Sequence, residues 1–278
     1  MVYFTAVTAS LLFGTLVSAQ SDDSALGVAA IQAHFSNAGL VPDLLENFEP
    51  QGTLTLNFDG VGDIQPGQAL SKDQVANSPA LTIATSNSSA TSGSFTVAMV
   101  DADIVGADES AVTRHWLVNS DSVKDNKVDH SSANTITDYA GPGPAEGSGA
   151  HRYVVLVYSQ PESFSPPSEL SQPGAAVEKY DFKKYVSDSG LGPLLAANYF
   201  TVEEGTSTVT VSETSAVESS TLSASSTGSG SGSGSGSASA TSTGEDAAST
   251  NENGAASFAT SGGLVSMAVS GLVALAMA

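Results

Sequence analysis

The chain has 278 residues, with 8 basic against 29 acidic side chains, a formal net charge of −21 and no cysteine. An acidic surface of this kind argues against nucleic-acid binding and against charge-driven docking on anionic membranes. The absence of cysteine excludes disulfides, thiol catalysis and iron–sulfur clusters, so a folded domain must be held by its apolar core alone.

The N-terminal segment has the pattern of a secretory signal. Residues 3–17 are mostly apolar, and small residues occupy positions 17–19. This pattern predicts a signal peptide over residues 1–19 that is cleaved after Ala19. Because the segment before the apolar run carries no Lys or Arg, a buried N-terminal helix is the alternative.

The C-terminal end predicts a lipid anchor. The small residues Asn253-Gly254-Ala255 are followed by a short spacer of weakly polar residues, Ala256–Gly263, and then by an apolar tail, Leu264–Ala278. Together they predict a GPI-attachment signal over residues 253–278, with attachment at Asn253 and removal of the tail. A tail anchor is the alternative, although the tail is shorter than the roughly 20 residues that a spanning helix needs.

Residues 206–252 are dominated by Ser, Thr, Gly and Ala. Such a composition predicts a disordered, O-glycosylated stalk, because it cannot bury enough surface to offset chain entropy. Asn87 begins an N-glycosylation sequon. We therefore expect a secreted chain that is held at the outer face of the plasma membrane or in the cell wall, with its membrane contact made through the GPI anchor only.

One domain remains, from Gln20 to about Gly205, with all eight basic residues inside it. A helix is expected over residues 24–36, where apolar residues recur at helical spacing, and another over Ala176–Val186. Short alternating or apolar runs predict strands at Thr53–Phe58, Ala80–Ala84, Ser94–Asp101, Arg114–Asn119 and His151–Tyr158. The fold class is mainly antiparallel β with a few flanking helices.

Three of these strands carry an ionisable group at one end of an apolar row. Asp101 ends its strand, whereas His115 and His151 stand near the beginning of theirs. If the strand that ends at Asp101 runs antiparallel to the neighbouring strands of His115 and His151, all three groups lie at the same edge of the sheet. A Gly/Pro-rich loop, Gly141–Gly149, lies next to His151 and allows backbone to approach a ligand closely.

Residues two apart in a strand share a face. This alternation predicts that Asp101 lies on the face of Met99, and that His151 shares a face with Tyr153. It places Arg152 on the opposite face, where a structural ion pair with a carboxylate is expected. In the strand 114–119, it predicts one face with His115, Leu117 and Asn119, and another with Arg114, Trp116 and Val118.

Four segments resemble the phosphatidylethanolamine-binding proteins. They are Val100–Asp103 (VDAD), Arg114–Asn119 (RHWLVN), Tyr139–Tyr158 (YAGPGPAEGSGAHRYVVLVY) and Phe182–Phe200. The third resembles the family's Gly-Pro loop and His-Arg-Tyr strand almost position by position, whereas the fourth is weak by itself. The predicted signal, stalk and anchor resemble the secreted, GPI-anchored fungal branch of that family.

The resemblance implies an antiparallel β-sandwich with flanking helices and a small anion pocket at one edge. Carried over residue by residue, the ligand-binding residues are Asp101, His115, Gly141, Gly143, Pro144, His151, Tyr153 and Tyr199. One departure bears on the pocket. The family's prolines in the Asp-containing turn are replaced here by Ala102 and by a stretch beginning Ile104-Val105, which predicts a less rigid turn.

The favoured function is a binding module that holds a small anionic group, such as a phospholipid head group, without chemistry or a cofactor. Two imidazoles can donate hydrogen bonds to a phosphate or carboxylate, and an aspartate favours the charged form of a histidine. The resemblance also suggests an inhibitor of a serine carboxypeptidase or another protease. A non-binding display protein of the cell wall is a third interpretation.

Catalysis is not expected. The chain has neither a Gly-x-Ser-x-Gly nucleophile elbow nor a His-Glu-x-x-His metal motif. Two histidines and one aspartate can form a weak metal site, which leaves a metal-dependent hydrolase as the minor alternative.

Overall fold

The computed structural model describes residues 19–208. The predicted signal peptide apart from Ala19, most of the predicted stalk and the predicted attachment signal with Asn253 lie outside the described residues. Within the described part of the chain, no helix is both long and apolar enough to cross a membrane.

The described residues form eleven strands, two α-helices and three short 3-10 helices. The helices are α1 (Ala19–Asn37), α2 (Phe182–Asp188), η1 (Asp73–Val75), η2 (Ser88–Thr91) and η3 (Ser168–Leu170). The strands are β1 (Thr53–Phe58), β2 (Gly62–Asp63), β3 (Gln68–Leu70), β4 (Ala80–Ala84), β5 (Ser94–Asp101), β6 (Val112–Lys124), β7 (Lys127–Asp129), β8 (Asn134–Thr137), β9 (His151–Gln160), β10 (Glu178–Tyr180) and β11 (Leu194–Val202). The predicted mainly β class is confirmed.

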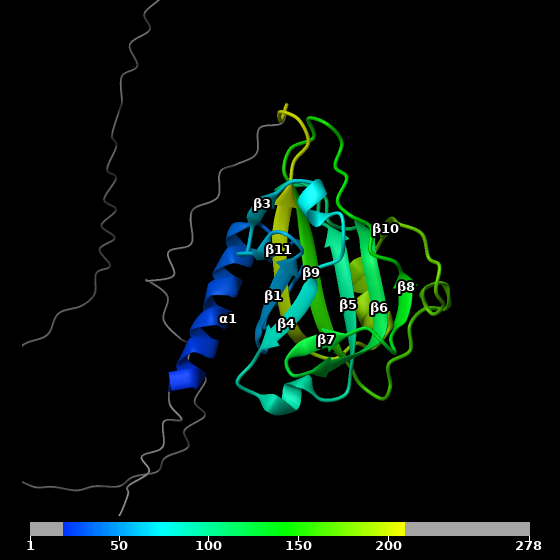
Figure 1. The fold of residues 1–278 in the computed structure, drawn as a ribbon. Coiled ribbons are helices and arrows are strands. Elements are labelled where there is room, and N and C mark those ends of the chain that lie inside the picture. Colours follow the sequence, from blue (N-terminus) through cyan, green and yellow to red (C-terminus); the bar gives the residue numbers. More distant parts are fainter. Residues whose placement is uncertain (1–18, 209–278) are drawn as a thin grey trace, which may run out of the picture. The chain divides into compact units, whose positions relative to one another are not determined.

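The strands form one curled sheet in the order β2-β1-β4-β7-β6-β5-β9-β11-β3, while β8 and β10 pair with β6. All pairs are antiparallel except β11 with β3. The long strand β6 belongs to both layers, since its first half pairs with β5 and its last residues, Ser122–Lys124, pair with β7. The layer of β1 and β4 therefore lies over β9 and β11 (Figure 1). The expected sandwich is thus a single sheet folded over itself.

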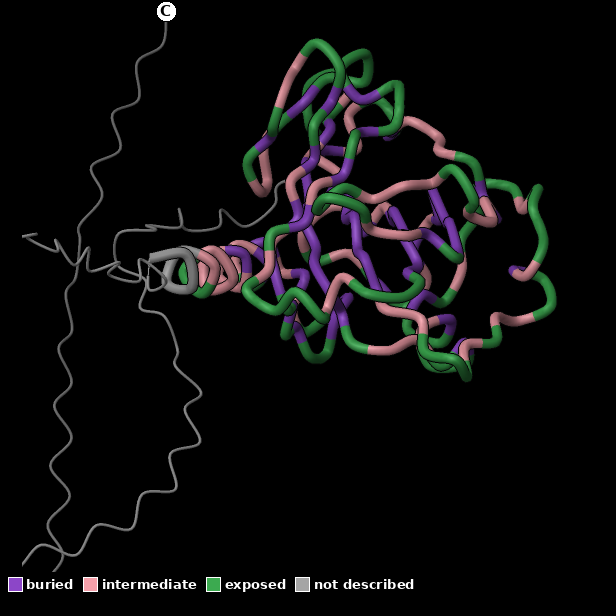
Figure 2. The backbone as a smooth tube through the Cα atoms, turned by 60° about the horizontal axis from the view of Figure 1, so that its bottom comes forward, coloured by how far each residue is buried: buried purple, intermediate pink, exposed green. Residues whose placement is uncertain are grey.

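An apolar core lies on each face of the central strands. One core is enclosed between the two layers and includes Leu56 of β1, Ile83 of β4 and Val155 of β9. The other lies on the outer face and includes Leu156 of β9 together with residues of α1 and α2. Strand β9 is buried on both faces, as the purple stretches of Figure 2 indicate for the central strands.

Helix α1 covers one side of the sheet. Its residues Ile31 and Phe35 are buried in the outer core. The ring of Phe35 stacks on Phe48 with centroids 4.2 Å apart, and it meets the ring of Tyr199 edge-on at 5.3 Å. The helix expected over residues 24–36 is confirmed, and it begins five residues earlier.

The second predicted helix is wrong in its first half. Residues 178–180 form strand β10, in which Glu178 pairs with Arg114 of β6. The helix begins only after Asp181, whose carboxylate accepts a hydrogen bond from the Lys184 amide at 2.8 Å. Pairing with the free edge of β6 overrides the local helical pattern, because it satisfies backbone groups that a helix end would leave open.

Five predicted strands are present, and three of them have the predicted bounds. Strands β6 and β9 extend beyond the predicted Asn119 and Tyr158 to Lys124 and Gln160. The long strand β11, Leu194–Val202, was not predicted, and most of it lies within Phe182–Phe200, the segment whose family resemblance is weak by itself.

Candidate anion pocket at the sheet edge

The three ionisable groups predicted to converge do so. Strand β5 lies between β6 and β9 and is antiparallel to both. Its last residue, Asp101, pairs with Thr113 of β6 and with Tyr153 of β9. The end of β5 therefore lies beside the beginnings of β6 and β9, which places Asp101, His115 and His151 at one edge of the sheet.

Asp101 and His151 form a hydrogen-bonded pair. His151 Nδ1 lies 3.0 Å and 3.2 Å from the two carboxylate oxygens of Asp101. Since a carboxylate only accepts, Nδ1 carries the proton and donates it. This hydrogen bond raises the pKa of His151, although partial burial opposes the shift. Burial likewise opposes ionisation of Asp101, but the hydrogen bond and charge of His151 outweigh it and hold the pKa of Asp101 below its usual value.

Ser148 is a pocket residue that the sequence interpretation missed. Its hydroxyl oxygen lies 3.0 Å from His151 Nε2 and 2.7 Å from the carbonyl oxygen of Ala145. A hydroxyl has one proton, and the carbonyl can only accept it, so the oxygen of Ser148 accepts from Nε2–H. Both ring nitrogens of His151 then donate, which describes an imidazolium. A serine in a Gly-rich loop gives no periodic signal that could have identified it.

The predicted faces of β6 are wrong at His115. Met99 of β5 pairs with Trp116, but the next residue, Val100, pairs with Arg114. His115 is therefore the extra residue of a β-bulge. One inserted residue reverses the alternation, so His115 and Arg114 exchange the faces that strict alternation predicts.

The bulge directs His115 toward the enclosed core, the face on which Trp116 and Tyr153 lie. The His115 ring meets the Tyr153 ring edge-on, with centroids 5.3 Å apart. Arg114 lies on the opposite face, with its guanidinium carbon 4.9 Å from the ring centre of Tyr180. The bulge is therefore what brings His115 to the same side of the sheet as His151.

His115 and Tyr153 complete the floor of the pocket. His115 Nδ1 donates to the carbonyl oxygen of Ala140 at 3.0 Å, and Nε2 makes no hydrogen bond to described residues. The hydroxyl of Tyr153 is buried and has no hydrogen-bond partner among the described residues. Burial, reinforced by the Asp101 carboxylate, raises the pKa of Tyr153, whereas the nearby backbone of Gly143 opposes the shift. The hydroxyl therefore remains a neutral donor.

The Gly/Pro loop forms one wall. Gly141 lies against η1, where an added Cβ would be 3.2 Å from both the Val75 carbonyl oxygen and the Ala76 Cα. Gly143 is exposed, and a Cβ built there would meet no atom within 4 Å. Pro144 is buried. The loop is thus packed tightly at Gly141 and open at Gly143.

Tyr199 lies away from the other predicted ligand-binding residues. It belongs to the outer core, on the opposite face of the sheet from Tyr153, and it packs against Phe35 of α1. Its hydroxyl donates to the carbonyl oxygen of His34 at 3.4 Å. In β11 the residue that points toward the pocket side is its neighbour Phe200, which stacks on Tyr153.

Arg152 supports the Asp-containing turn from the opposite face of β9. Its guanidinium donates to the carbonyl oxygens of Ala102, Asp103 and Ile104 at 2.7–3.0 Å. It also forms a buried ion pair with Glu109 at 2.6 Å, so the predicted structural ion pair is confirmed. This turn positions the backbone amide of Asp103, which donates a hydrogen bond to Asp101 Oδ1 at 2.7 Å.

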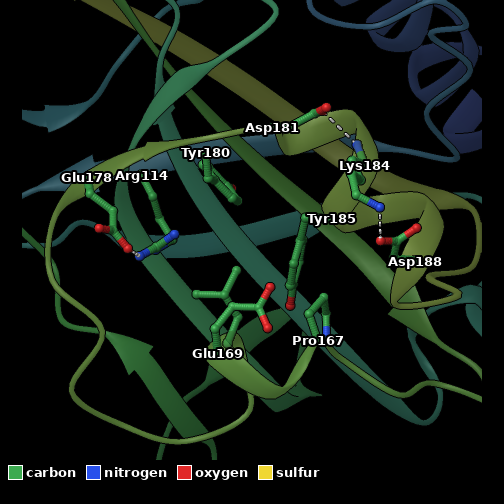
Figure 3. Close-up of a pocket in the computed structure, with 10 residues that line it drawn as sticks. Arg114, Pro167, Glu169, Glu178, Tyr180, Asp181, Lys184, Tyr185 and Asp188 are labelled. Atoms are coloured by element: carbon green, nitrogen blue, oxygen red, sulfur yellow. Dashed lines mark hydrogen bonds and ion pairs between the residues drawn. The ribbon is translucent and has the colours of Figure 1, made fainter.

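A separate hollow of about 170 Å³ lies on the outer-core side of the sheet (Figure 3). Its charged side chains are largely paired with one another. Arg114 bonds to Glu178, and Lys184 bonds to Asp188 and through its amide to Asp181. Because these pairs satisfy its charges internally, the hollow does not compete with the histidine pocket as the candidate site.

No group of three or more His, Asp or Glu side chains within residues 19–208 is arranged to hold a metal ion. The carboxylate of Asp101 and both nitrogens of His151 are already committed to hydrogen bonds. A metal would have to displace the protons of an imidazolium, so the donor set fits an anion better than a cation.

Comparison with known proteins agrees with this geometry. Residues 46–200 match the family model described as phosphatidylethanolamine-binding protein. The chain belongs to this family. The chain is also similar to CEN-like protein 1 of Nicotiana tabacum, to which it is 25% identical over 171 residues, covering 61% of this chain and 91% of that protein.

One protease inhibitor is similar to this chain in both sequence and structure. The chain is 24% identical over 208 residues to the carboxypeptidase Y inhibitor of Saccharomyces cerevisiae, covering 61% of this chain and 93% of the inhibitor. The crystal structure of that inhibitor with its cognate proteinase superposes with a TM-score of 0.52 at 20% identity, covering 66% of this chain and 97% of the inhibitor. The superposition supports the fold of the family.

Proposed function

We propose that the chain is a binding module that holds a small anionic group, such as the phosphate of a phospholipid head group, at the edge where β5, β6 and β9 meet. The anion would accept a hydrogen bond from the Tyr153 hydroxyl and lie next to His115 Nε2, which makes no hydrogen bond to the described residues. The imidazolium of His151 would supply positive charge beside it. The open space at Gly143 would admit the rest of the ligand.

The observation that carries this proposal is the buried hydroxyl of Tyr153, which makes no hydrogen bond of normal geometry to the described residues, although the Asp101 carboxylate and the Gly143 backbone lie near it. Leaving a buried donor unsatisfied costs about 1–3 kcal/mol, so such groups are uncommon unless a ligand or water completes them. This donor lies beside the His115 ring and near the charged pair of Asp101 and His151. An anion with several acceptor oxygens matches that set of donors.

We propose binding without chemistry. Asp101, His151 and Ser148 follow one another as in a hydrolase triad, in which a serine gives its proton to the histidine. Here the Ser148 proton goes to the Ala145 carbonyl, and His151 Nε2 donates to the serine oxygen. This arrangement opposes nucleophile activation, and we expect Ser148 to be inert to fluorophosphonate probes.

The test is a titration of the full chain with inorganic phosphate and with phosphoethanolamine, followed by NMR of the histidine rings. We expect saturable shifts of the His115 and His151 signals, and their loss in Tyr153→Phe, which removes only the hydroxyl. The control is His34→Gln, since His34 lies on α1 away from the pocket. An unchanged spectrum at millimolar ligand would overturn the proposal.

The same titration has a predicted pH dependence. Affinity should fall as His151 loses its proton, and it should persist above pH 6.5, because Asp101 raises the pKa of that ring. Equal affinity from pH 5 to pH 9 would show that no imidazolium contributes.

Inhibition of a serine carboxypeptidase is the second candidate, favoured by the similarity to the carboxypeptidase Y inhibitor. The measurement is the inhibition constant of the purified chain against a serine carboxypeptidase, with Tyr153→Phe in parallel. Equal inhibition by both chains would assign the inhibitory surface to a region outside the pocket. No inhibition at micromolar chain would remove this candidate.

We also propose that the chain is secreted, anchored by GPI at Asn253 and glycosylated at Asn87, at the plasma membrane or in the wall. Asn87 is exposed, and its side-chain oxygen Oδ1 accepts a hydrogen bond from the Ser89 backbone amide. The side-chain nitrogen Nδ2, which would carry the glycan, takes no part in that bond. Release from cells by a phosphatidylinositol-specific phospholipase tests the anchor. A mobility shift with peptide-N-glycosidase that Asn87→Gln abolishes tests the glycan.

A further inference from the structure

The segment that follows β11 is bonded to the loop that carries Ser148. The Gly147 amide donates to the Glu204 carbonyl oxygen at 2.8 Å. In return, the amide and the hydroxyl of Thr208 donate to the Gly147 carbonyl oxygen at 3.1 Å and 3.0 Å. Residues 206–208, which belong to the predicted stalk, thus contact the pocket loop.

The packing between the two segments is close. A Cβ on Gly205 would lie 2.7 Å from Cγ of Glu146, and one on Gly149 would lie 3.4 Å from Oγ of Ser207. Gly205 has a φ of +68°, a backbone conformation that glycine adopts without strain. Only a residue without a side chain allows the C-terminal segment to turn and lie so near the loop.

A second contact ties the C-terminal segment to η1. Glu204 forms an ion pair with Lys72 at 2.6 Å, next to η1. Gly141 of the Gly/Pro loop also packs on η1, and Tyr139 donates to the Val75 carbonyl oxygen there at 2.7 Å. Residues 204–208 are therefore bonded both to the loop that carries Ser148 and to Lys72 beside η1, and we call this segment the clasp.

We propose that the clasp holds Ser148 against His151 and thereby makes Ser148 a positioning residue of the anion pocket. The inference rests on the proposed function, because its consequence is the affinity for an anion. Ser148 directs Nε2–H while Asp101 directs Nδ1–H, so the ring is held at both nitrogens.

The clasp matters because other charged groups face His151. The Asp103 carboxylate lies 3.5 Å from Nε2, and it favours the charged ring as Asp101 does, whereas Arg152 opposes it. Asp103 is half exposed, and its Oδ1 already accepts a hydrogen bond from the Ile104 amide at 2.8 Å. The neutral hydroxyl of Ser148, at 3.0 Å, is therefore the closest partner of Nε2. Losing the clasp would free the loop and take away the closest acceptor of the Nε2 proton.

The test uses the full chain with Gly205→Val, Ser148→Ala and the double variant. Gly205→Val introduces both backbone strain and the contact with Glu146, and it changes neither a strand residue nor a residue that bonds to His151. Gly60→Val is the matched control, because Gly60 has a φ of +76° and no atom within 4 Å of an added Cβ. Ser148→Thr keeps the hydroxyl and should restore the wild-type values.

Two readouts are measured, the affinity for inorganic phosphate and the pKa of His151 by NMR without ligand. We expect Gly205→Val and Ser148→Ala each to weaken phosphate binding by about two- to tenfold, as loss of one hydrogen bond implies. Both should lower the pKa of His151, because an oxygen that accepts from Nε2 stabilises the charged ring. The double variant should match the single variants, since both changes remove one contact.

Two results would overturn the inference. One is an unchanged pKa of His151 in Gly205→Val or in Ser148→Ala. The other is a double variant whose loss of phosphate affinity equals the product of the losses in the two single variants. If the wild-type chain binds no phosphate, the proposed function fails, but the pKa readout still decides whether the clasp acts on His151.

Discussion

At the level of single residues, Asp101 and His151 act as one charged unit. The carboxylate holds the proton on Nδ1, and the imidazolium keeps the carboxylate ionised despite its burial. Arg152 supports this unit from the opposite face by fixing the turn that carries Asp103. The charge of the pocket thus depends on neighbours on both faces of β9.

The interaction between Asp101 and His151 should stabilise the fold within a limited range of pH. The pKa of Asp101 is lowered, so its contribution is present above its unfolded value near 4 and is lost as pH falls. The pKa of His151 is raised, so its contribution is complete below 6.5 and is lost as pH rises through its folded value. We expect the difference in unfolding free energy between wild type and Asp101→Asn to be largest between about pH 4 and 6.5.

The measurement is urea unfolding of both chains from pH 3 to pH 9. Glu162→Gln, a substitution on the exposed surface, is the control for general charge effects. A difference that stays constant across this range would show that the pair does not contribute through ionisation.

At the level of elements, pairing partners decide where strands and helices begin. Strand β10 interrupts a helical pattern because the edge of β6 accepts it, and the bulge at His115 allows Arg114 and His115 to face opposite cores. Helix α2 is then short, and its first turn relies on Asp181 to accept from the Lys184 amide.

The start of α2 is therefore predicted to depend on its cap. Asp181→Ala should lower the unfolding free energy by about 1 kcal/mol, because it leaves helix N–H groups without an acceptor. Asp181→Asn keeps the acceptor and should remain within a few tenths of a kcal/mol of wild type. Chemical denaturation measures both variants, and equal losses for alanine and asparagine would assign the effect to charge instead.

At the level of the whole molecule, one strand connects the two cores. Val155 is buried in the core between the layers, and its neighbour Leu156 is buried in the core under α1 and α2. Because β9 contributes to both, neither core can lose its contacts with β9 independently. This arrangement favours a single cooperative transition on unfolding.

Leu156→Ala should cost about 2–5 kcal/mol, and Val155→Ala should also destabilise the chain, since each leaves a cavity in a packed core. Each variant should unfold in one transition when followed by both tryptophan fluorescence, which reports Trp116 between the layers, and far-UV circular dichroism. Two separated transitions in either variant would contradict the coupling of the cores through β9.

Much of the site was predictable because its residues sit on strands with clear local patterns. Asp101, His115 and His151 each end or begin an apolar row, and the antiparallel order of three short strands suffices to bring them to one edge. The Gly/Pro loop and Tyr153 adjoin His151 in the sequence. These features depend on contacts between residues close in the chain or on a simple strand order.

The amino-acid sequence by itself determined the fold class, the positions of five of the eleven described strands, and the meeting of one aspartate with two histidines. Only the tertiary structure decided that a bulge turns His115 into the enclosed face, that Tyr199 faces the outer core, and that Ser148 completes the contacts of His151. The spacing of apolar residues along the chain predicts whether a segment is a helix or a strand and which of its faces is buried. Register, bulges and loop contacts arise from partners far along the chain, which a local pattern does not contain.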